Sequence, residues 1–228
     1  MRIKIRPNNR KPWALRLRQE LSEFLRQNGH RIVARGADAT ICIGGDGTIY
    51  YAAFRNAIEG RLIGIGSKTS FVCQLREDNW KGRILPLLRQ GSLRLTLQGH
   101  WHGTTRRALA DFVIHSQDYR VVWVLVEVNG RVHRFEGDGV IVATATGSSG
   151  YAYSAGGPRL RPHSSDVLVV PICPYRRTMK PLRLRTFRKP IRIWSDKDTM
   201  LILDGRVLGP LPKGKRLVIG KGEPAVFA

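Results

Sequence analysis

The sequence predicts an α/β domain over residues 1–91, followed by an all-β domain over residues 92–228. Two observations predict this division. Strand-like and helix-like segments alternate as far as Gly91, and beyond it helical periodicity almost disappears while strand-like segments continue. Alternating strands and helices indicate a mostly parallel sheet with helices on its faces, whereas strands alone indicate an all-β fold.

In the first domain, apolar spacing and helix start and stop signals predict each element. Residues 2–5 alternate as a strand, Pro12 opens a helix with apolar residues at helical spacing, and Gly29 ends it. Further strands are expected at residues 31–34, 39–43 and 61–65, and further helices over residues 48–58 and in a segment capped by Asp78 or Asn79.

The second domain is expected to consist of short strands and tight turns. Asn129-Gly130 and Asp204-Gly205 are hairpin turn signals, because both central residues of such turns need positive φ. Strands are expected at residues 94–97, 108–115, 121–128, 131–136, 140–144, 167–172, 191–194 and 200–203.

The chain is strongly basic, with 39 Lys and Arg against 17 Asp and Glu and a formal net charge of +22. Such a charge attracts polyanions, including nucleic acid and phosphorylated small molecules. The basic residues are scattered along the chain, and neither zinc-finger spacing nor an RNP-type aromatic pattern is present. We therefore expect a solvated Arg-rich surface and no specific nucleic-acid partner, with a non-catalytic nucleotide- or nucleic-acid-binding module as an alternative.

The sequence also predicts a cytoplasmic protein. The N-terminus lacks the apolar region of a signal peptide, and no apolar run is long enough to cross a membrane. The three cysteines, Cys42, Cys73 and Cys173, are widely spaced and odd in number. We interpret them as buried thiols in a reducing compartment, neither a disulfide framework nor a zinc site.

The first chemical motif is Gly44-Gly45-Asp46-Gly47-Thr48, between a predicted buried strand and a helix. Glycines let the backbone approach a phosphate, and the following helix offers free N–H groups at its positive end. A carboxylate beside a phosphate would be repelled unless it accepted a proton from an attacking hydroxyl or held Mg²⁺. The alternative is a tight strand-to-helix turn in which Asp46 only caps the helix.

This motif resembles the signature that NAD kinases share with diacylglycerol kinases, sphingosine kinases and, more distantly, phosphofructokinases. The resemblance implies phosphoryl transfer to a hydroxyl, with Asp46 at the catalytic centre and with Gly45, Gly47 and Thr48 at the nucleotide. It does not select the substrate, so a kinase acting on another small hydroxyl compound or nucleotide is also open.

The second motif extends from Gly137 to Pro158 and is dense in glycine and hydroxyl residues. Its donors suit a polar, sugar-bearing ligand: Asp138 can accept from ribose hydroxyls, Tyr151 can stack on a ring, and Thr146 and Ser149 can bond phosphate or amide groups. The alternative is a Gly-rich crossover whose Ser and Thr side chains bond their own backbone.

The order Gly-Asp-Gly, strand, Thr-x-Thr-Gly-Ser, Tyr and Ser-Ala-Gly-Gly-Pro is similar to the pattern of the NAD kinase family, with Asp204-Gly205-Arg206 as a further echo. This resemblance implies an α/β domain followed by a β-sandwich domain, with the last residues of the chain returning to the first domain. It implies transfer of a phosphate from ATP or polyphosphate to the adenosine 2′-hydroxyl of NAD, or of NADH, with Mg²⁺, in a homodimer or homotetramer. The residues implied at the dinucleotide are Phe71, Asp111, Asp138, Thr146, Ser149, Gly150 and Tyr151.

One departure from the family pattern concerns the residue before Asp111. The family usually has Asn followed by an acid, and here Ala110 precedes Asp111. Alanine cannot supply the amide hydrogen bonds of Asn. The loss of such a contact typically costs about 1 kcal/mol of binding free energy.

Overall fold

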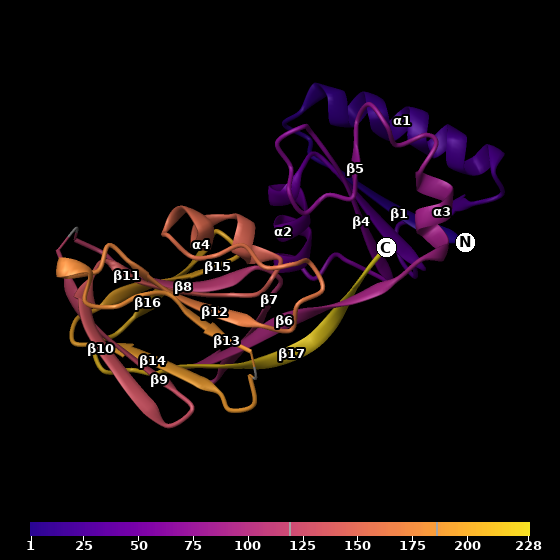
Figure 1. The fold of residues 1–228 in the computed structure, drawn as a ribbon. Helices are drawn as coiled ribbons and strands as arrows, with labels where there is room; N and C mark the ends of the chain where they lie inside the picture. The colour runs from indigo at the N-terminus through magenta and orange to yellow at the C-terminus, as the bar shows by residue number, and fades with distance from the viewer. Residues whose placement is uncertain (119, 186) are drawn as a thin grey trace. The chain divides into compact units, whose positions relative to one another are not determined.

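The computed structural model describes residues 1–118, 120–185 and 187–228, which form two compact units (Figure 1). Unit 1 comprises Met1–Leu93 and the C-terminal Ala225–Ala228, and unit 2 comprises Arg94–Pro224. Two strands, β6 and β17, contain the residues at which the chain passes from one unit to the other. No helix in the described part of the chain is both long and apolar enough to cross a membrane.

Unit 1 is an α/β unit built on a parallel sheet. Its strands are ordered β2, β1, β3, β4 and the end of β17, with β5 also paired to β4, and every one of these pairings is parallel. The elements are β1 (Arg2–Pro7), α1 (Pro12–Gln27), β2 (Arg31–Ile32), β3 (Ala39–Ile43), α2 (Asp46–Phe54), β4 (Arg61–Gly66), β5 (Leu75–Arg76) and α3 (Ile84–Arg89).

Helices cover both faces of this sheet. Successive residues of its strands point to opposite faces, and apolar side chains lie on both. Ala39, Ile41 and Ile43 of β3 share a core with the apolar stripe of α1 and with Ile84 of α3. On the opposite face, α2 lies close to β4: a β-carbon at Gly64 would stand 2.6 Å from Cδ1 of Ile49. The carboxyl ends of β1, β3 and β4 therefore meet at one edge, where the Gly44–Thr48 turn lies.

Unit 2 consists of two sheets and a short helical segment. One sheet has the order β13, β12, β11, β8, β15 and β16, and the other contains β10, β9, β14, β17, β6 and β7. The elements are β6 (Ser92–Trp101), β7 (Thr104–Ala108), β8 (Asp111–Ser116), β9 (Val122–Val128), β10 (Arg131–Gly137), β11 (Gly139–Ala143), η1 (Gly147–Ser149), α4 (Tyr151–Ser154), β12 (Val167–Ile172), η2 (Tyr175–Arg177), β13 (Leu182–Leu184), β14 (Ile191–Ser195), β15 (Thr199–Leu203), β16 (Arg206–Leu211) and β17 (Leu217–Phe227).

The two sheets of unit 2 pack face to face. The ring of Phe112, on β8, lies where a β-carbon on Gly99 of β6 would stand, at 2.6 Å. The other face of the β8 and β11 sheet is covered by the segment that contains α4, through Ala152 and Leu160 (Figure 1). An α/β unit followed by a β-rich sandwich unit confirms the predicted fold class.

Several element predictions were wrong in detail. The helix expected over 48–58 begins two residues earlier and ends at Phe54, because Asn56 has a positive φ of 49°. The strand expected over 108–115 is two strands, β7 and β8, broken at Leu109 and Ala110. The helix α4 and the long strand β17 were not anticipated, because α4 is a single turn and β17 contains glycines and Pro224.

Candidate functional site

The Gly44–Thr48 turn leaves the end of the buried strand β3 and enters α2 directly. Gly44 and Gly45 have φ values of 143° and 109°, which side chains rarely adopt. A β-carbon on Gly44 would also lie 2.5 Å from Cβ of Asn8 and 2.6 Å from Oγ1 of Thr48. The turn therefore requires glycine at position 44 for both conformation and space.

Asp46 is the first residue of α2, and its carboxylate is held by a neighbouring loop. Oδ2 accepts a hydrogen bond from the amide of Phe71 at 2.8 Å, and Oδ1 accepts from the amides of Val72 and Cys73 at 3.0 and 3.2 Å. The Cys73 thiol forms a further side-chain hydrogen bond with this carboxylate. Asp46 is therefore held tightly by one loop at the start of α2. Among the described residues, the amides found to donate to the Asp46 carboxylate come from this loop and not from α2.

The loop that holds Asp46 comes from the end of β4. Ser70 lies against the turn, with Oγ 3.2 Å from where a β-carbon on Gly45 would be. Phe71 donates its amide to Asp46 while its side chain is 61% exposed. Burial, followed by the charge of Asp46, raises the pKa of the Cys73 thiol, so this sulfur stays protonated beside the carboxylate.

Two residues at this turn were missed by the sequence reasoning, namely Asn8 and Lys11. Both follow β1, the strand next to β3. Lys11 Nζ donates to the carbonyl of Gly44 at 2.6 Å. The backbone N–H of Asn8 donates to the carbonyl of Ile43 at 2.7 Å. Polar residues after a strand that neighbours the motif strand are the signal that could have found them.

In unit 2, four predicted residues of the second motif, Thr146, Ser149, Gly150 and Tyr151, follow β11 in one continuous segment, whereas Asp138 lies between β10 and β11. Thr144 anchors this segment: its hydroxyl donates to the carbonyl of Leu109 at 2.6 Å, and its amide donates to that of Ala110 at 2.8 Å. Thr146 is buried and Gly150 is exposed. This anchoring brings Gly147 against the backbone of Ala110. Position 147 requires glycine, because a β-carbon there would lie 2.4 Å from the carbonyl oxygen of Ala110.

Asp111 and Asp138 each lie within electrostatic range of the Tyr151 hydroxyl in unit 2. Burial, and after it the charges of Cys173, Asp138 and Asp111, raise the pKa of the Tyr151 hydroxyl. Cys173 was not among the residues predicted to bind the dinucleotide. Burial and a hydrogen bond with Asp138 raise the pKa of its thiol. The prediction that all cysteines are buried was wrong, since Cys173 is exposed and Cys73 is half-buried, although all three are free thiols.

Asp111 also has a second buried carboxylate beside it, that of Asp204. Asp204 accepts hydrogen bonds from the amides of Leu109, Ala110 and Asp111 at 2.8 to 3.1 Å. Burial and the charge of Asp204 raise the pKa of Asp111 to about 7, and burial raises the pKa of Asp204 to about 6. The amide donors favour the charged form of Asp204, so the proton near neutral pH resides on Asp111.

Unit 1 thus brings together Gly45, Asp46, Gly47, Thr48 and Phe71, while unit 2 brings together Asp111, Asp138 and the segment from Thr146 to Tyr151. No group of three or more His, Cys, Asp or Glu suited to a metal ion occurs among the described residues. Asp46 is a single carboxylate at the turn, which fits a Mg²⁺ ion held mainly by phosphate oxygens and water.

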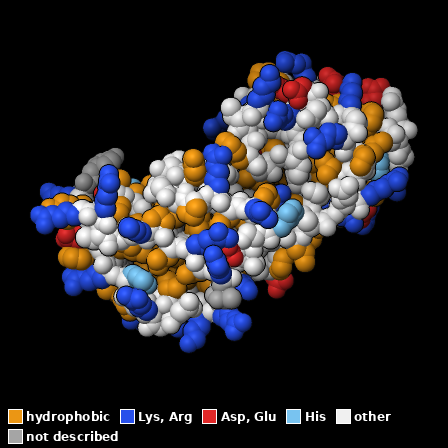
Figure 2. All heavy atoms as spheres, viewed as in Figure 1, with side chains coloured by type: hydrophobic (Ala, Val, Ile, Leu, Met, Phe, Trp, Pro, Cys, Tyr) orange, Lys and Arg blue, Asp and Glu red, His pale blue; other side chains and the backbone are white. Residues whose placement is uncertain are grey.

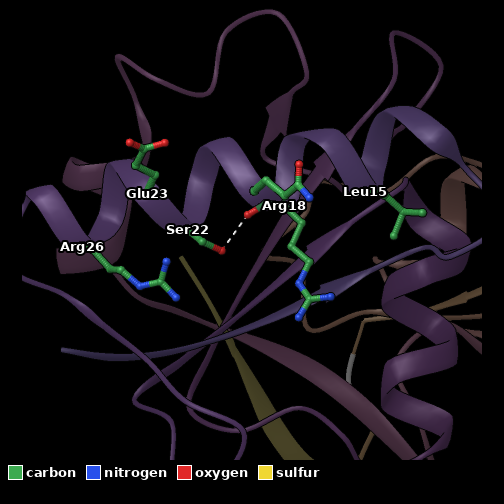
Figure 3. A pocket seen from close by; sticks show the side chains of 6 residues that line it. Leu15, Arg18, Ser22, Glu23 and Arg26 are labelled. Atoms are coloured by element: carbon green, nitrogen blue, oxygen red, sulfur yellow. Dashed lines mark hydrogen bonds between the residues drawn. The ribbon is translucent and has the colours of Figure 1, made fainter.

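A groove of about 780 Å³ runs along one side of α1. In Figure 3, Arg18 and Arg26 point to the same side of the helix with Ser22 between them, and the Ser22 hydroxyl donates to the carbonyl of Arg18. None of the predicted site residues lines this groove. On the face shown in Figure 2, Lys and Arg side chains are spread over each unit with few acidic side chains among them.

Solved structures share this architecture along the whole chain. An NAD kinase from Archaeoglobus fulgidus, crystallised with ATP, covers 100% of this chain and 93% of its own at 24% identity, with a TM-score of 0.83. Yeast NADH kinase, crystallised with NADH, covers 100% and 82% at 19% identity, with a TM-score of 0.84. These likenesses define the class of protein by its fold, an α/β unit followed by a β-rich unit.

Sequence comparison narrows the class to one family. The family model of the ATP-NAD kinase C-terminal domain matches residues 112–227. The NAD kinase of Aquifex aeolicus (strain VF5) is 31% identical over 221 residues, which covers 90% of this chain and 78% of the relative. The chain belongs to the NAD kinase family.

Proposed function

We propose that this protein transfers a phosphate from ATP or polyphosphate to the adenosine 2′-hydroxyl of NAD, forming NADP, with Asp46 as the general base. The observation that carries this proposal is the position of the Asp46 carboxylate, which the amides of Phe71, Val72 and Cys73 hold beside the glycine turn at the start of α2. Membership of the NAD kinase family and the relative crystallised with ATP support the substrates.

In this mechanism Asp46 orients and deprotonates the attacking hydroxyl. The ribose oxygen forms a bond to the terminal phosphorus, its proton passes to Oδ2, and the bond from that phosphorus to the bridging oxygen breaks. The electron pair of the broken bond leaves on the shortened donor. Phosphoryl transfer depends mainly on alignment and charge stabilisation, so one base and a rigid turn are sufficient protein chemistry.

The turn also supplies donors for phosphate oxygens. Amides in the first turn of a helix have no intrahelical acceptor, and in α2 these include the amides of Asp46 and Gly47. Thr48 adds a hydroxyl at the same turn. Mg²⁺ bound mainly by phosphate oxygens and water would neutralise the charge on the donor.

The residues of unit 2 are proposed to bind the dinucleotide. Asp138 accepts hydrogen bonds from ribose hydroxyls, and Tyr151, which is partly exposed, stacks on a ring. Thr146, Ser149 and Gly150 offer hydroxyl and amide donors, and Asp111 adds a carboxyl group. Ala110 stands where the family usually has Asn, so the hydrogen bonds of that Asn side chain are missing. This absence favours a second candidate function, a kinase acting on another nucleotide or small hydroxyl compound.

An assay of NADP formation from NAD and Mg²⁺, with ATP or polyphosphate, tests the proposal. Asp46→Asn is expected to lower kcat about 10²- to 10⁴-fold, the usual contribution of a general base. Circular dichroism and thermal unfolding check that the variant is folded, and Asp118→Asn, at an exposed position, is the matched control. Absence of NADP with every donor, or full activity of Asp46→Asn, would contradict the proposal.

The same assay with NADH and with other nucleotides separates the remaining alternatives. Turnover of another nucleotide but not of NAD would favour the second candidate. Binding of RNA or DNA that weakens steeply with salt, without any turnover, would favour a non-catalytic binding module. We also propose a cytoplasmic homodimer or homotetramer, which light scattering after size-exclusion chromatography tests; the free cysteines support a reducing compartment.

A further inference from the structure

Lys11 places a positive charge at the glycine turn of unit 1. It is the N-terminal cap residue of α1, and its ammonium group crosses to β3, where it donates to the carbonyl of Gly44. A β-carbon on Gly45 would lie 3.9 Å from Nζ of Lys11. The ammonium group therefore stands beside the backbone on which phosphate oxygens are proposed to lie.

The Lys11 ammonium group has N–H donors that the Gly44 carbonyl does not use. An ammonium group has three N–H donors, and the Gly44 carbonyl accepts one of them. None of the salt bridges found within the described residues involves Lys11. Its other close neighbour is the ring of Trp13, whose centre is 5.8 Å from Nζ. A half-buried cation without a carboxylate partner favours an anionic ligand.

The surroundings of Lys11 reinforce this preference. The helix α2 begins at the turn, and α1 begins directly after Lys11. Neither helix has a side-chain cap, so their positive ends add to the lysine charge. Asn8, from the same loop as Lys11, approaches Thr48 at 3.5 Å and closes the turn on that side. The loop after β1, the turn after β3 and Ser70 after β4 thus surround one small region of backbone donors.

We propose that Lys11 binds the condensed phosphate chain of the donor and positions it for transfer. This inference rests on the proposed function and adds a binding residue from a part of the chain outside both motifs. The shared chemistry of the two candidate donors is a chain of phosphate groups, which a point charge recognises without a base or sugar.

Steady-state kinetics of Lys11→Met and Lys11→Arg test this assignment. For Lys11→Met we expect the KM for the donor to rise about 10- to 100-fold, the usual loss for one charged hydrogen bond, with the KM for NAD unchanged within about twofold. Lys11→Arg keeps the charge and should recover most of the donor affinity. Separate arms with ATP and with polyphosphate show which chain Lys11 binds.

Lys81→Met is the matched control, because Nζ of Lys81 also lies 5.7 Å from a Trp ring, that of Trp80, but away from the turn. It should leave both KM values unchanged. Equal donor KM in wild type and Lys11→Met overturns the inference, and so does an equal change in both KM values with a lower melting temperature, which indicates a structural role.

Calorimetric titration of ATP or polyphosphate without NAD separates this inference from the proposed function. If wild type binds a donor and Lys11→Met binds it at least about 10-fold more weakly, the assignment stands even if NAD is not phosphorylated. If the wild type binds neither donor, the assignment is wrong.

Discussion

Gly44 and Gly47 lie in the same motif but face different constraints. Gly44 combines a φ of 143° with two contacts closer than 3 Å at a β-carbon position, whereas no atom lies within 4 Å of a β-carbon on Gly47. Strain at such a φ and overpacking each cost about 1–3 kcal/mol. We expect Gly44→Ala to lower the free energy of unfolding by about 2–5 kcal/mol, as measured by urea denaturation.

Gly47→Ala is the counterpart that separates stability from activity. It lies in the first turn of α2, where alanine favours the helix, so stability should be unchanged or higher by up to about 1 kcal/mol. A methyl group there would hinder a phosphate that approaches the backbone, and kcat/KM for the donor should fall. Equal loss of stability in the two variants would show that the turn is not shaped as described.

At the residue scale, the sequence located the chemistry that lies within one segment. Asp46 could be placed at the end of a buried strand because its motif is contiguous. The contacts of Lys11 and of the Ser70–Cys73 loop with the turn could not be found in this way, although the family resemblance named Phe71. These contacts depend on strands β1 and β4 lying on either side of β3. Asp204 was expected in a hairpin turn and as part of the family pattern. The structure shows in addition that its carboxylate accepts hydrogen bonds from amides more than 90 residues earlier.

At the element scale, strong periodicity predicted the long helix and the buried strands, and β3 has the bounds expected from the sequence. Elements with weak periodicity were not predicted correctly. The break between β7 and β8 is stabilised by Asp204, a distant residue, so local sequence could not reveal it. The strand β17 has two glycines and a proline, and pairing with β14 and β4 overrides that composition.

Asp111, the first residue of β8, is expected to make the free energy of unfolding depend on pH. Asp111 has a pKa raised from 3.8 to about 7 by burial and the Asp204 charge. Below about pH 4 the group is protonated in both folded and unfolded chains, and its stabilising contribution is fully present. As pH rises towards 7, the unfolded chain loses this proton first, so stability falls by up to about 1.4 kcal/mol per pH unit.

Asp111→Asn removes this titration. The difference in unfolding free energy between wild type and Asp111→Asn should therefore shift in favour of the variant between pH 4 and pH 8. Urea denaturation at intervals of one pH unit measures it. Parallel stability curves across this range would show that Asp111 is not protonated in the folded chain.

At the scale of the whole molecule, the chain closes unit 1 with its last residues. Phe227 is fully buried and pairs with Leu62 of β4, Ala228 donates its amide to the carbonyl of Leu62, and Gln74 donates its side-chain amide to the carbonyl of Ala228. All of unit 2 lies between these residues and the rest of unit 1 in sequence. The core of unit 1 is therefore complete only when residues 225–228 have been made.

Phe227→Ala tests this dependence in the full chain. Removing a buried Phe side chain typically costs about 3–5 kcal/mol, and the loss should fall on unit 1. Hydrogen exchange should show lower protection in β3 and β4 while β11 and β12 keep theirs. Val207→Ala, at a position 63% exposed in β16, is the control and should change stability by less than about 0.5 kcal/mol. Equal deprotection of β11 and β12 in Phe227→Ala would mean that the two units unfold as one cooperative structure, and that the last residues stabilise more than unit 1.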